Sequence, residues 1–230
     1  AYQLPLDDQR IPLNDAIGKS IAIEHIGDIH CIHCGRRSKK SFSQGYCYPC
    51  FTKLPQCDTC IMSPERCHFH HGTCRDPAWG EKYCFTDHFV YLANSSGVKV
   101  GITRGTQLPT RWIDQGATQG LPIFRVQTRY QAGLIEDCIR EFVADKTSWQ
   151  KMLKGNAESV DLAVIRDELM AKAESGLELL EQEFGLQALQ RLYNETTTQI
   201  NFPVHEFPEK VKSLNLDKQP LVEGVLKGIK

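Results

Sequence analysis

The sequence predicts an α+β fold in four parts. These parts are a β platform at 1–30, a cysteine-rich zinc-binding domain at 31–88, a mixed core at 89–150, and a helical segment with short strands at 151–230. Nine of the ten cysteines lie in the second part, which indicates a metal scaffold. In the third part, apolar runs of strand length alternate with helical patterns. The fourth part opens with a long helical pattern and ends in a β-rich stretch punctuated by prolines.

The first thirty residues have the pattern of a small β structure. Residues 2–6 alternate apolar and polar side chains, and residues 20–26 form a second strand-like run that leads into the first cysteines. Turn-forming residues stand at 7–8 and 14–15. We therefore expect a β platform that carries the metal-binding part.

The most specific signal is a pair of C-x-x-C motifs. Cys31-x-x-Cys34 and Cys47-x-x-Cys50 are separated by twelve residues, the spacing of a zinc ribbon. Each motif brings two thiolates to one ion, so the pair predicts a closed, structural Cys₄ zinc site. Two disulfides are the alternative, which we disfavour because no secretory signal is visible.

A second group of candidate ligands follows, and its pairing stays open. The candidates are Cys57, Cys60, Cys67, Cys74, Cys84 and His88, and His68, His70 and His71 are further candidates. Cys84 and His88 have acceptable chelate spacing, and Cys67 with Cys74 competes for the same role. We expect a second zinc ion here. Cys138 lies on an apolar helical stripe and is expected in the core.

A basic loop separates the first two motifs. It contains Arg36, Arg37, Lys39 and Lys40. Such a loop can contact a nucleic-acid backbone, or it can be a solvated hairpin tip.

The core combines strand and helix patterns in a definite order. It consists of an apolar strand at 89–93, a turn at 94–97, a strand at 98–103, a short helix from Arg111 behind Pro109, a strand at 121–129, and a helix at 132–146. The last helix has a buried stripe made of Leu134, Ile135, Cys138, Ile139 and Phe142. The predicted order is therefore ββαβα.

Four features of this core occur in a fixed order. They are Tyr91 on the first strand, Lys99-Val100-Gly101 on the second, Arg111 on the first helix, and Ala132-Gly-Leu-Ile-Glu136 on the second helix. This arrangement resembles the GIY-YIG nuclease superfamily over roughly sixty residues. Phe89 replaces the family's first glycine and Lys99 its second tyrosine, although some branches carry lysine there. The polar residue that usually follows the glutamate helix has candidates only at 146–149.

The resemblance implies a metal-dependent phosphodiesterase. Glu136 would hold one Mg²⁺ or Mn²⁺ that keeps several of its waters. Tyr91 would orient or deprotonate the attacking water, and Lys99 would lower the pKa of that tyrosine. Arg111, with Arg104, would clamp the phosphate through planar N–H donors.

Charge is distributed unevenly along the chain. The net charge is −1, which excludes a globally basic nucleic-acid binder. Between residues 89 and 131, however, Asp114 is the only acidic residue, and the basic residues there are Lys99, Arg104, Arg111, Arg125 and Arg129. This local excess is what a phosphate-binding surface requires, although incidental arginines on a solvated face would also produce it. No apolar run approaches the length of about 18 residues of a membrane span.

The C-terminal part predicts a long helix followed by short elements. Ser159 would cap the helix, Gly176 would interrupt it and Gly185 would end it. A shorter helix is expected at 186–193, and an open edge strand at 221–226. The acidic helix face is expected to be solvated and consists of Glu174, Glu178, Glu181 and Glu183.

Two further runs, at 43–50 and 72–80, resemble a bacterial domain-of-unknown-function family with a cysteine-rich front half. This resemblance implies a cytoplasmic protein. Together, the zinc motifs and the four ordered features of the core favour a zinc-scaffolded protein that acts on nucleic acid, either DNA or RNA, as a phosphodiesterase. A non-catalytic nucleic-acid- or ribosome-binding module is the first alternative. A protein-interaction adaptor, with zinc serving only for stability, is the second.

Overall fold

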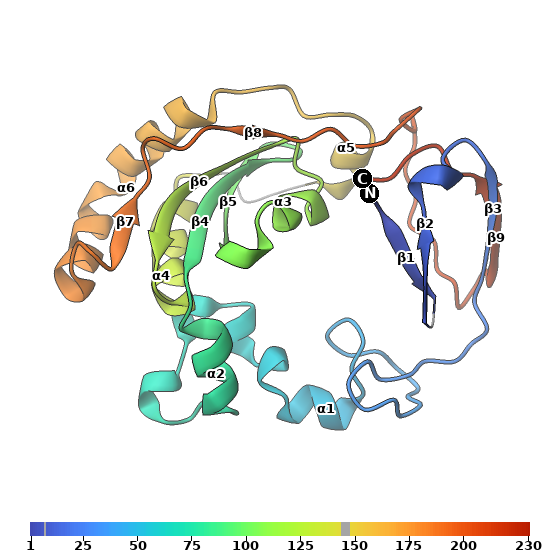
Figure 1. Cartoon of the computed structure of the whole chain (residues 1–230), viewed down its shortest axis with the longest axis horizontal. Helices are drawn as coiled ribbons and strands as arrows, with labels where there is room; N and C mark the ends of the chain where they lie inside the picture. Colours follow the sequence, from blue (N-terminus) through green and yellow to red (C-terminus); the bar gives the residue numbers. More distant parts are fainter. Residues whose placement is uncertain (7, 144–147) are drawn as a thin grey trace.

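The computed structural model describes residues 1–6, 8–143 and 148–230, and it is a mixed α and β structure (Figure 1). An antiparallel sheet with helices on both faces forms one end of the molecule, and two small sheets form the other. The cysteine-rich segment connects these two ends along one side (Figure 1). Of the polar residues expected after the glutamate helix, Lys146 and Thr147 lie outside the described residues.

Both ends of the chain build the β platform. β1 (Gln3–Leu6) and β2 (Gln9–Pro12) form an antiparallel hairpin. β3 (Ser20–Glu24) pairs antiparallel with β9 (Leu221–Val225). The strand expected at the C-terminus is therefore present as β9, an edge strand of a two-stranded sheet, with β3 paired along one side of it.

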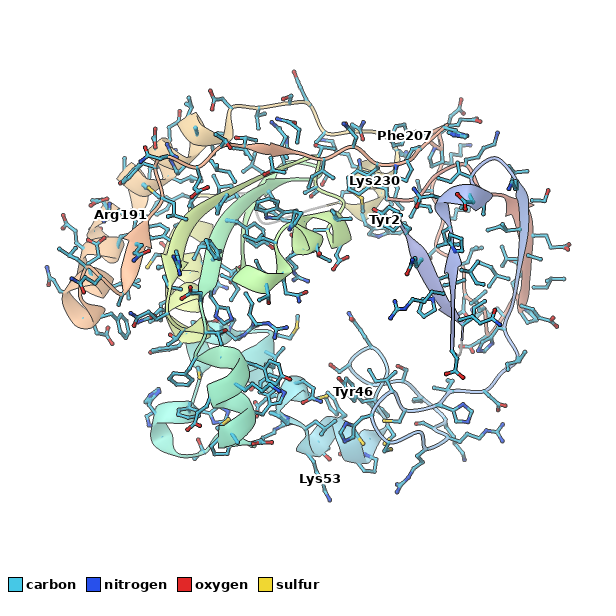
Figure 2. All side chains as sticks on the ribbon, in the orientation of Figure 1. Tyr2, Tyr46, Lys53, Arg191, Phe207 and Lys230 are labelled. Carbon is cyan, nitrogen blue, oxygen red and sulfur yellow. The ribbon has the colours of Figure 1, made fainter. Side chains whose placement is uncertain are left out.

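The last residue ties this platform to the middle of the chain. The Lys230 ammonium donates to the Gly155 carbonyl at 2.8 Å, just beyond α5 (Trp149–Leu153). The same ammonium lies 5.4 Å from the Phe202 ring centroid and 5.6 Å from that of Phe207, which Figure 2 labels. The charge is therefore held by a carbonyl and two aromatic rings.

The cysteine-rich segment is built from short helices. They are α1 (Tyr48–Lys53), the 3₁₀ helices η2 (Pro55–Cys57), η3 (Thr59–Ile61), η4 (Pro64–Arg66) and η5 (Phe69–His71), and α2 (Pro77–Cys84). α2 begins where the Asp76 side chain accepts a hydrogen bond from the Trp79 N–H, with Pro77 in the first helical position. In place of the paired strands of a zinc ribbon, the described residues around the first two motifs form isolated bridges, His30 with Arg37 and Phe42 with Tyr46.

The central sheet has the strand order β5-β4-β6-β7, with all neighbours antiparallel. Its strands are β4 (His88–Asn94), β5 (Val98–Arg104), β6 (Gln119–Val126) and β7 (Leu189–Arg191), and β8 (Thr198–Gln199) also pairs with β6. η6 (Gly105–Gln107) and α3 (Thr110–Asp114) connect β5 to β6, and α4 (Arg129–Arg140) follows β6. The elements thus occur in the predicted order ββαβα.

The boundary between β6 and α4 differs from the sequence prediction. The strand ends at Val126, because Thr128 caps α4. The Thr128 hydroxyl accepts from the Gln131 N–H, and the Gln131 side chain accepts from the Thr128 N–H, so a capping box fixes the helix start.

The two faces of the sheet carry separate cores. Val90 and Leu92 point into the larger core, which α4 and α6 (Leu162–Phe184) cover. Tyr91 and Ala93 point into a smaller core that contains Trp112 of α3. Alternation along the strand therefore sends neighbouring residues of β4 to opposite faces, and Figure 1 shows α3 and α4 on opposite sides of the sheet.

α6 differs from its prediction in two respects. It begins after Asp161, whose carboxylate accepts from the Ala163 and Val164 N–H groups, so Ser159 is not its cap. It also continues through Gly176, where an added Cβ would lie 3.2 Å from the Cys138 Sγ. The glycine therefore allows α4 and α6 to approach closely.

The region after α6 also differs from its prediction. The short helix expected at 186–193 is wrong, because β7 pairs with β6 there and buries Leu189. The expected solvated acidic face is partly wrong as well. Glu174 and Glu181 each accept at 2.7 Å from the guanidinium of Arg191, the last residue of β7, which Figure 2 labels. Within the described part of the chain, no helix has the length and apolar character needed to cross a membrane.

Candidate functional site

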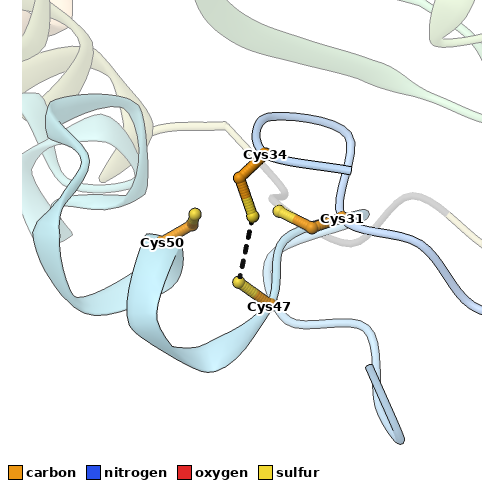
Figure 3. Close-up of side chains that lie close together, drawn as sticks. All are labelled: Cys31, Cys34, Cys47 and Cys50. Atoms are coloured by element: carbon orange, nitrogen blue, oxygen red, sulfur yellow. Dashed lines mark hydrogen bonds between the residues drawn. The ribbon is translucent and has the colours of Figure 1, made fainter. Parts of the chain in front are cut away.

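The four cysteines of the first two motifs converge on one point (Figure 3). The sulfur atoms of Cys31, Cys34, Cys47 and Cys50 all lie within 4.8 Å of one another, and the Cys34 and Cys47 sulfurs are 3.8 Å apart. Cys31 and Cys34 lie on a tight turn, while Cys47 directly precedes α1 and Cys50 lies within it. All ten cysteines are free thiols. This cluster could hold a zinc ion, because four thiolates complete a tetrahedral, closed site.

The thiols of this cluster differ in acidity. Burial would raise the pKa of Cys31, but hydrogen bonds from the Cys47, Cys34 and His33 backbone lower it to about 6. Burial and its three thiol neighbours raise the pKa of Cys50 to about 12. One thiolate is therefore readily available, and the remaining protons leave when an ion binds.

A second group of thiols surrounds a small cavity between the 3₁₀ helices and α2. Cys60, Cys67, Cys74 and Cys84 line it. Of the sequence candidates, Cys57 and His88 do not line this cavity. The Cys57 thiol is instead hydrogen-bonded to Ser43, which lies in the loop between the first two C-x-x-C motifs.

Asp58, Cys60 and His68 also line this cavity, and their ligand atoms lie within 4.8 Å of one another. Asp58 already has two partners: the Arg75 guanidinium at 2.8 Å and the His68 Nε2 at 3.5 Å. Burial would raise the pKa of Asp58, but Arg75 and the hydrogen bonds from Thr59 and His68 lower it. The carboxylate is therefore stabilised in its charged form by an ion pair.

His88 lies within the sheet. Its ring is fully buried, and Nδ1 is 2.7 Å from the Thr86 carbonyl oxygen. Burial lowers its pKa to about 4, so the ring is neutral at physiological pH. Nδ1 then donates to Thr86, and Nε2 has no hydrogen-bond partner among the described atoms.

Tyr91 and Arg111, which the sequence analysis placed in one site, are in direct contact. The Tyr91 hydroxyl donates to the Gln115 Oε1 at 3.1 Å and is hydrogen-bonded to the Arg111 guanidinium. The Tyr91 side chain is completely buried, with the Trp112 ring 5.9 Å away in an edge-on arrangement. Burial raises the pKa of Tyr91, although Arg111 acts in the opposite direction. The expectation that Lys99 gives Tyr91 a lowered pKa is therefore wrong, because desolvation dominates.

Lys99 and Glu136 come from different elements, a strand of the sheet and the helix α4. Lys99 lies two residues from Gly101 on β5, on the sheet face that Tyr91 shares. Glu136 comes from α4, which packs on the other face but contacts the edge strand β5. Its charge nevertheless acts on the Tyr91 hydroxyl and on Arg129. Glu136 is half-buried and within electrostatic range of the tyrosine.

The basic residues that were expected to contact phosphate lie in three separate places. Arg104 and Arg125 line an open groove of about 610 Å³, and Arg125 is also paired with Asp87. Arg129 is half-buried and donates to the Ile61 carbonyl at 2.6 Å, so it serves an internal contact. The basic loop between the first two motifs is exposed at Arg36, Arg37, Lys39 and Lys40, and Arg37 pairs with Asp28 at 2.7 Å.

Three residues near these sites were not singled out from the sequence. Gln115 follows Arg111 by four positions, a helical spacing that could have indicated that both reach Tyr91. Lys82 and Tyr83 line the same groove as Arg104, but α2 lies before the core in sequence and nothing in the pattern connects them.

The fold and the thiol cluster define a mixed α and β protein with a candidate structural zinc site. The chain belongs to the family whose model is described as "protein of unknown function (DUF2797)", which matches residues 18–230. This match confirms the resemblance to a domain-of-unknown-function family. No curated protein and no solved structure matches the chain.

Proposed function

We propose that this chain is a zinc-scaffolded protein that acts on nucleic acid, and that its core hydrolyses phosphodiester bonds with Mg²⁺ or Mn²⁺. The hydrogen bond between Tyr91 and Arg111, together with the effect of the Glu136 charge on the Tyr91 hydroxyl, supports this proposal most directly. These three residues come from β4, α3 and α4, so only the folded core brings them together.

The residue types suit phosphodiester hydrolysis. The Arg111 guanidinium is exposed at the surface of α3 and has the planar N–H groups that match a phosphate. Glu136 offers a hard carboxylate oxygen, and a single carboxylate suits Mg²⁺ because this ion keeps most of its waters. A divalent ion held there would neutralise charge on the phosphate. Tyr91 orients Arg111 and Gln115 through its hydroxyl.

An aromatic and basic groove lies near the start of β4. Its lining includes Lys82, Tyr83, Phe89, Arg104 and Arg125. The Arg104 guanidinium lies 5.3 Å from the Tyr83 ring centroid, and the Lys82 ammonium lies 5.2 Å from it. Cations beside aromatic rings suit phosphates and bases of a nucleic-acid strand.

The groove and the tyrosine share one face of the sheet. Phe89 and Tyr91 are two positions apart on β4, so their side chains point to the same face about 7 Å apart. A strand bound in the groove would therefore lie on the face of the sheet to which Tyr91 points. The cysteine-rich segment contributes α2, which forms one wall of the groove.

One observation favours a second function, a nucleic-acid- or ribosome-binding module without catalysis. Tyr91 has no exposed surface, and burial raises its pKa. A phenol that is buried and protonated cannot take a proton from water at neutral pH. In this second function the groove binds phosphate, and Tyr91 only positions Arg111.

A cleavage assay separates the two functions. Single- and double-stranded DNA and RNA are incubated with the zinc-loaded chain and Mg²⁺ or Mn²⁺. The parent is compared with Glu136→Gln, which keeps the side-chain size but removes the ligand charge. Glu141→Gln, at the end of the same helix, is the matched control. We expect cleavage that falls about a hundredfold or more in Glu136→Gln and not in Glu141→Gln.

If the parent binds nucleic acid but does not cleave it, the binding module is the correct function. If a zinc-loaded parent neither cleaves nor binds nucleic acid, the adaptor is the function that remains. Zinc content and thermal unfolding are measured on every variant first, so that a loss of fold is not counted as a loss of chemistry.

A further inference from the structure

Four thiols from four separate short segments face one small cavity. Cys60 lies in η3, Cys67 follows η4, Cys74 precedes α2 and Cys84 is its last residue. The cavity has a volume of about 20 Å³. That is roughly the space of one water molecule or one metal ion.

The segment around this cavity has almost no apolar core of its own. It consists mainly of three-residue 3₁₀ helices. Between residues 55 and 87 of the described chain, the buried apolar side chains are those of Pro55, Cys57 and Pro64. Short helices without apolar burial are not stable by themselves. A bound ion would supply the missing free energy, as it does in other small cysteine-rich domains.

Arg129 provides a second, independent observation. It lies at the start of α4, and its guanidinium reaches the cysteine-rich segment, where it donates to the Ile61 carbonyl at 2.6 Å. Its Nε is buried and has no hydrogen-bond partner among the described atoms. A zinc ion with four thiolates carries a net charge of −2, and its sulfurs accept N–H hydrogen bonds. The guanidinium charge already acts on Cys84 and Cys60, so it stands where it would offset that charge.

The neighbouring polar side chains are occupied otherwise. Asp58 is paired with Arg75 at 2.8 Å, and the His68 Nδ1 lies 2.8 Å from the Thr73 hydroxyl. Asp58 and His68 also line the cavity, and their ligand atoms lie within 4.8 Å of the Cys60 sulfur. Because both side chains already have these partners, the four sulfurs are the favoured donor set. Soft thiolate donors in a closed site select zinc over the hard cations.

We infer that the chain binds a second structural zinc ion through Cys60, Cys67, Cys74 and Cys84. This ion links η3, the turn after η4 and both ends of the segment that contains α2. Because η4 packs against α4 and Arg129 leads from α4 to the thiols, the ion also fixes the cysteine-rich module to the core. The inference does not depend on the proposed phosphodiesterase activity.

Metal content of the purified full chain tests this inference. We expect two zinc ions per chain for the parent, measured by plasma mass spectrometry against the protein concentration. The double variant Cys67→Ser/Cys74→Ser should retain one ion, and so should Cys34→Ser/Cys50→Ser in the first cluster. Cys138→Ser, which lies on α4 outside both clusters, should retain two and serves as the control.

Cadmium-113 NMR of the cadmium-exchanged parent provides a readout without substitutions. Two resonances in the range of four-thiolate sites are expected. A single resonance, or one zinc ion per parent chain, overturns the inference. A second resonance in the range of mixed sulfur and nitrogen ligands also overturns it, because His68 would then be a ligand. If the double variant does not fold, the stoichiometry and the two parent resonances decide.

Discussion

The Tyr91 hydroxyl lies against Gly101 on the neighbouring strand. The two residues are directly paired between β4 and β5. A Cβ added at position 101 would lie 2.7 Å from the tyrosine oxygen and 2.8 Å from its Cζ. The glycine is therefore required by the close approach of a buried ring, which Trp112 and two hydrogen bonds hold in place.

Replacement of Gly101 by alanine should move the Tyr91 ring and loosen Arg111. We expect a loss of about 1–3 kcal/mol in the free energy of unfolding, because overpacking a filled site costs that much. Urea unfolding of parent and variant measures it. Gly155→Ala is the control, since nothing lies within 4 Å of its added Cβ. Equal stability of Gly101→Ala and the parent would show that the ring can move freely.

Local signals in the sequence predicted the core and the first cluster. The order ββαβα follows from apolar runs and turn residues that are close in sequence, and the two C-x-x-C motifs are a local pattern. Interactions between distant residues were not predicted. β9 pairs with β3 across nearly the whole chain, and β7 forms a strand only because β6 offers a partner. Local propensity carries no information about such partners.

The sequence also predicted only part of the candidate site. The sequence placed Tyr91, Arg111 and Glu136 in one site by their resemblance to a family pattern. It did not predict that Tyr91 would be fully buried, or that burial would raise its pKa. Burial depends on Trp112 and Ala117, which come from α3 and the loop after it. Electrostatic environments of this kind arise only when separate elements pack together.

The first cysteine cluster should control the order of its own segment. Cys34→Ser removes one thiolate from the group that could hold zinc. We expect amide hydrogen exchange over residues 31–54 to rise by about a hundredfold or more, because little else stabilises this segment. β4 and β6 should remain protected, since the cluster contributes nothing to the large core. Cys138→Ser is the control. Uniform deprotection of the sheet would mean that the cluster also holds the core together.

Arg104 should contribute to nucleic-acid binding through its charge. It lines the groove and lies beside the Tyr83 ring. Arg104→Ala should weaken the binding of a short duplex about three- to tenfold and reduce the slope of log K against log salt concentration by about 0.9. Fluorescence anisotropy at several salt concentrations measures both quantities. Arg140→Ala removes an equal charge from α4, where Arg140 is paired with Asp137, and should have no effect. Equal losses for both variants would indicate a general charge effect and no specific groove.

His88 should make the fold sensitive to acid. Its ring is fully buried, and burial is the main cause that lowers its pKa to about 4. Arg129 and Arg104 act in the same direction, whereas the Thr86 carbonyl and Asp87 oppose them. In the unfolded chain a histidine has a pKa of about 6.5. Between these two values the unfolded state binds a proton that the folded state excludes, so stability falls as the pH drops from about 6.5 towards 4.

A comparison with His88→Gln isolates this contribution. Glutamine does not titrate, so it removes the proton-linked term and leaves the other acid-sensitive groups, including the thiols, unchanged. Relative to the variant, the parent should lose about 2 kcal/mol of unfolding free energy when the pH falls from about 7.5 to about 5. Urea unfolding at several pH values in this interval measures the difference. A difference that stays constant with pH would show that His88 is protonated equally in both states, for example because the ring gains access to water.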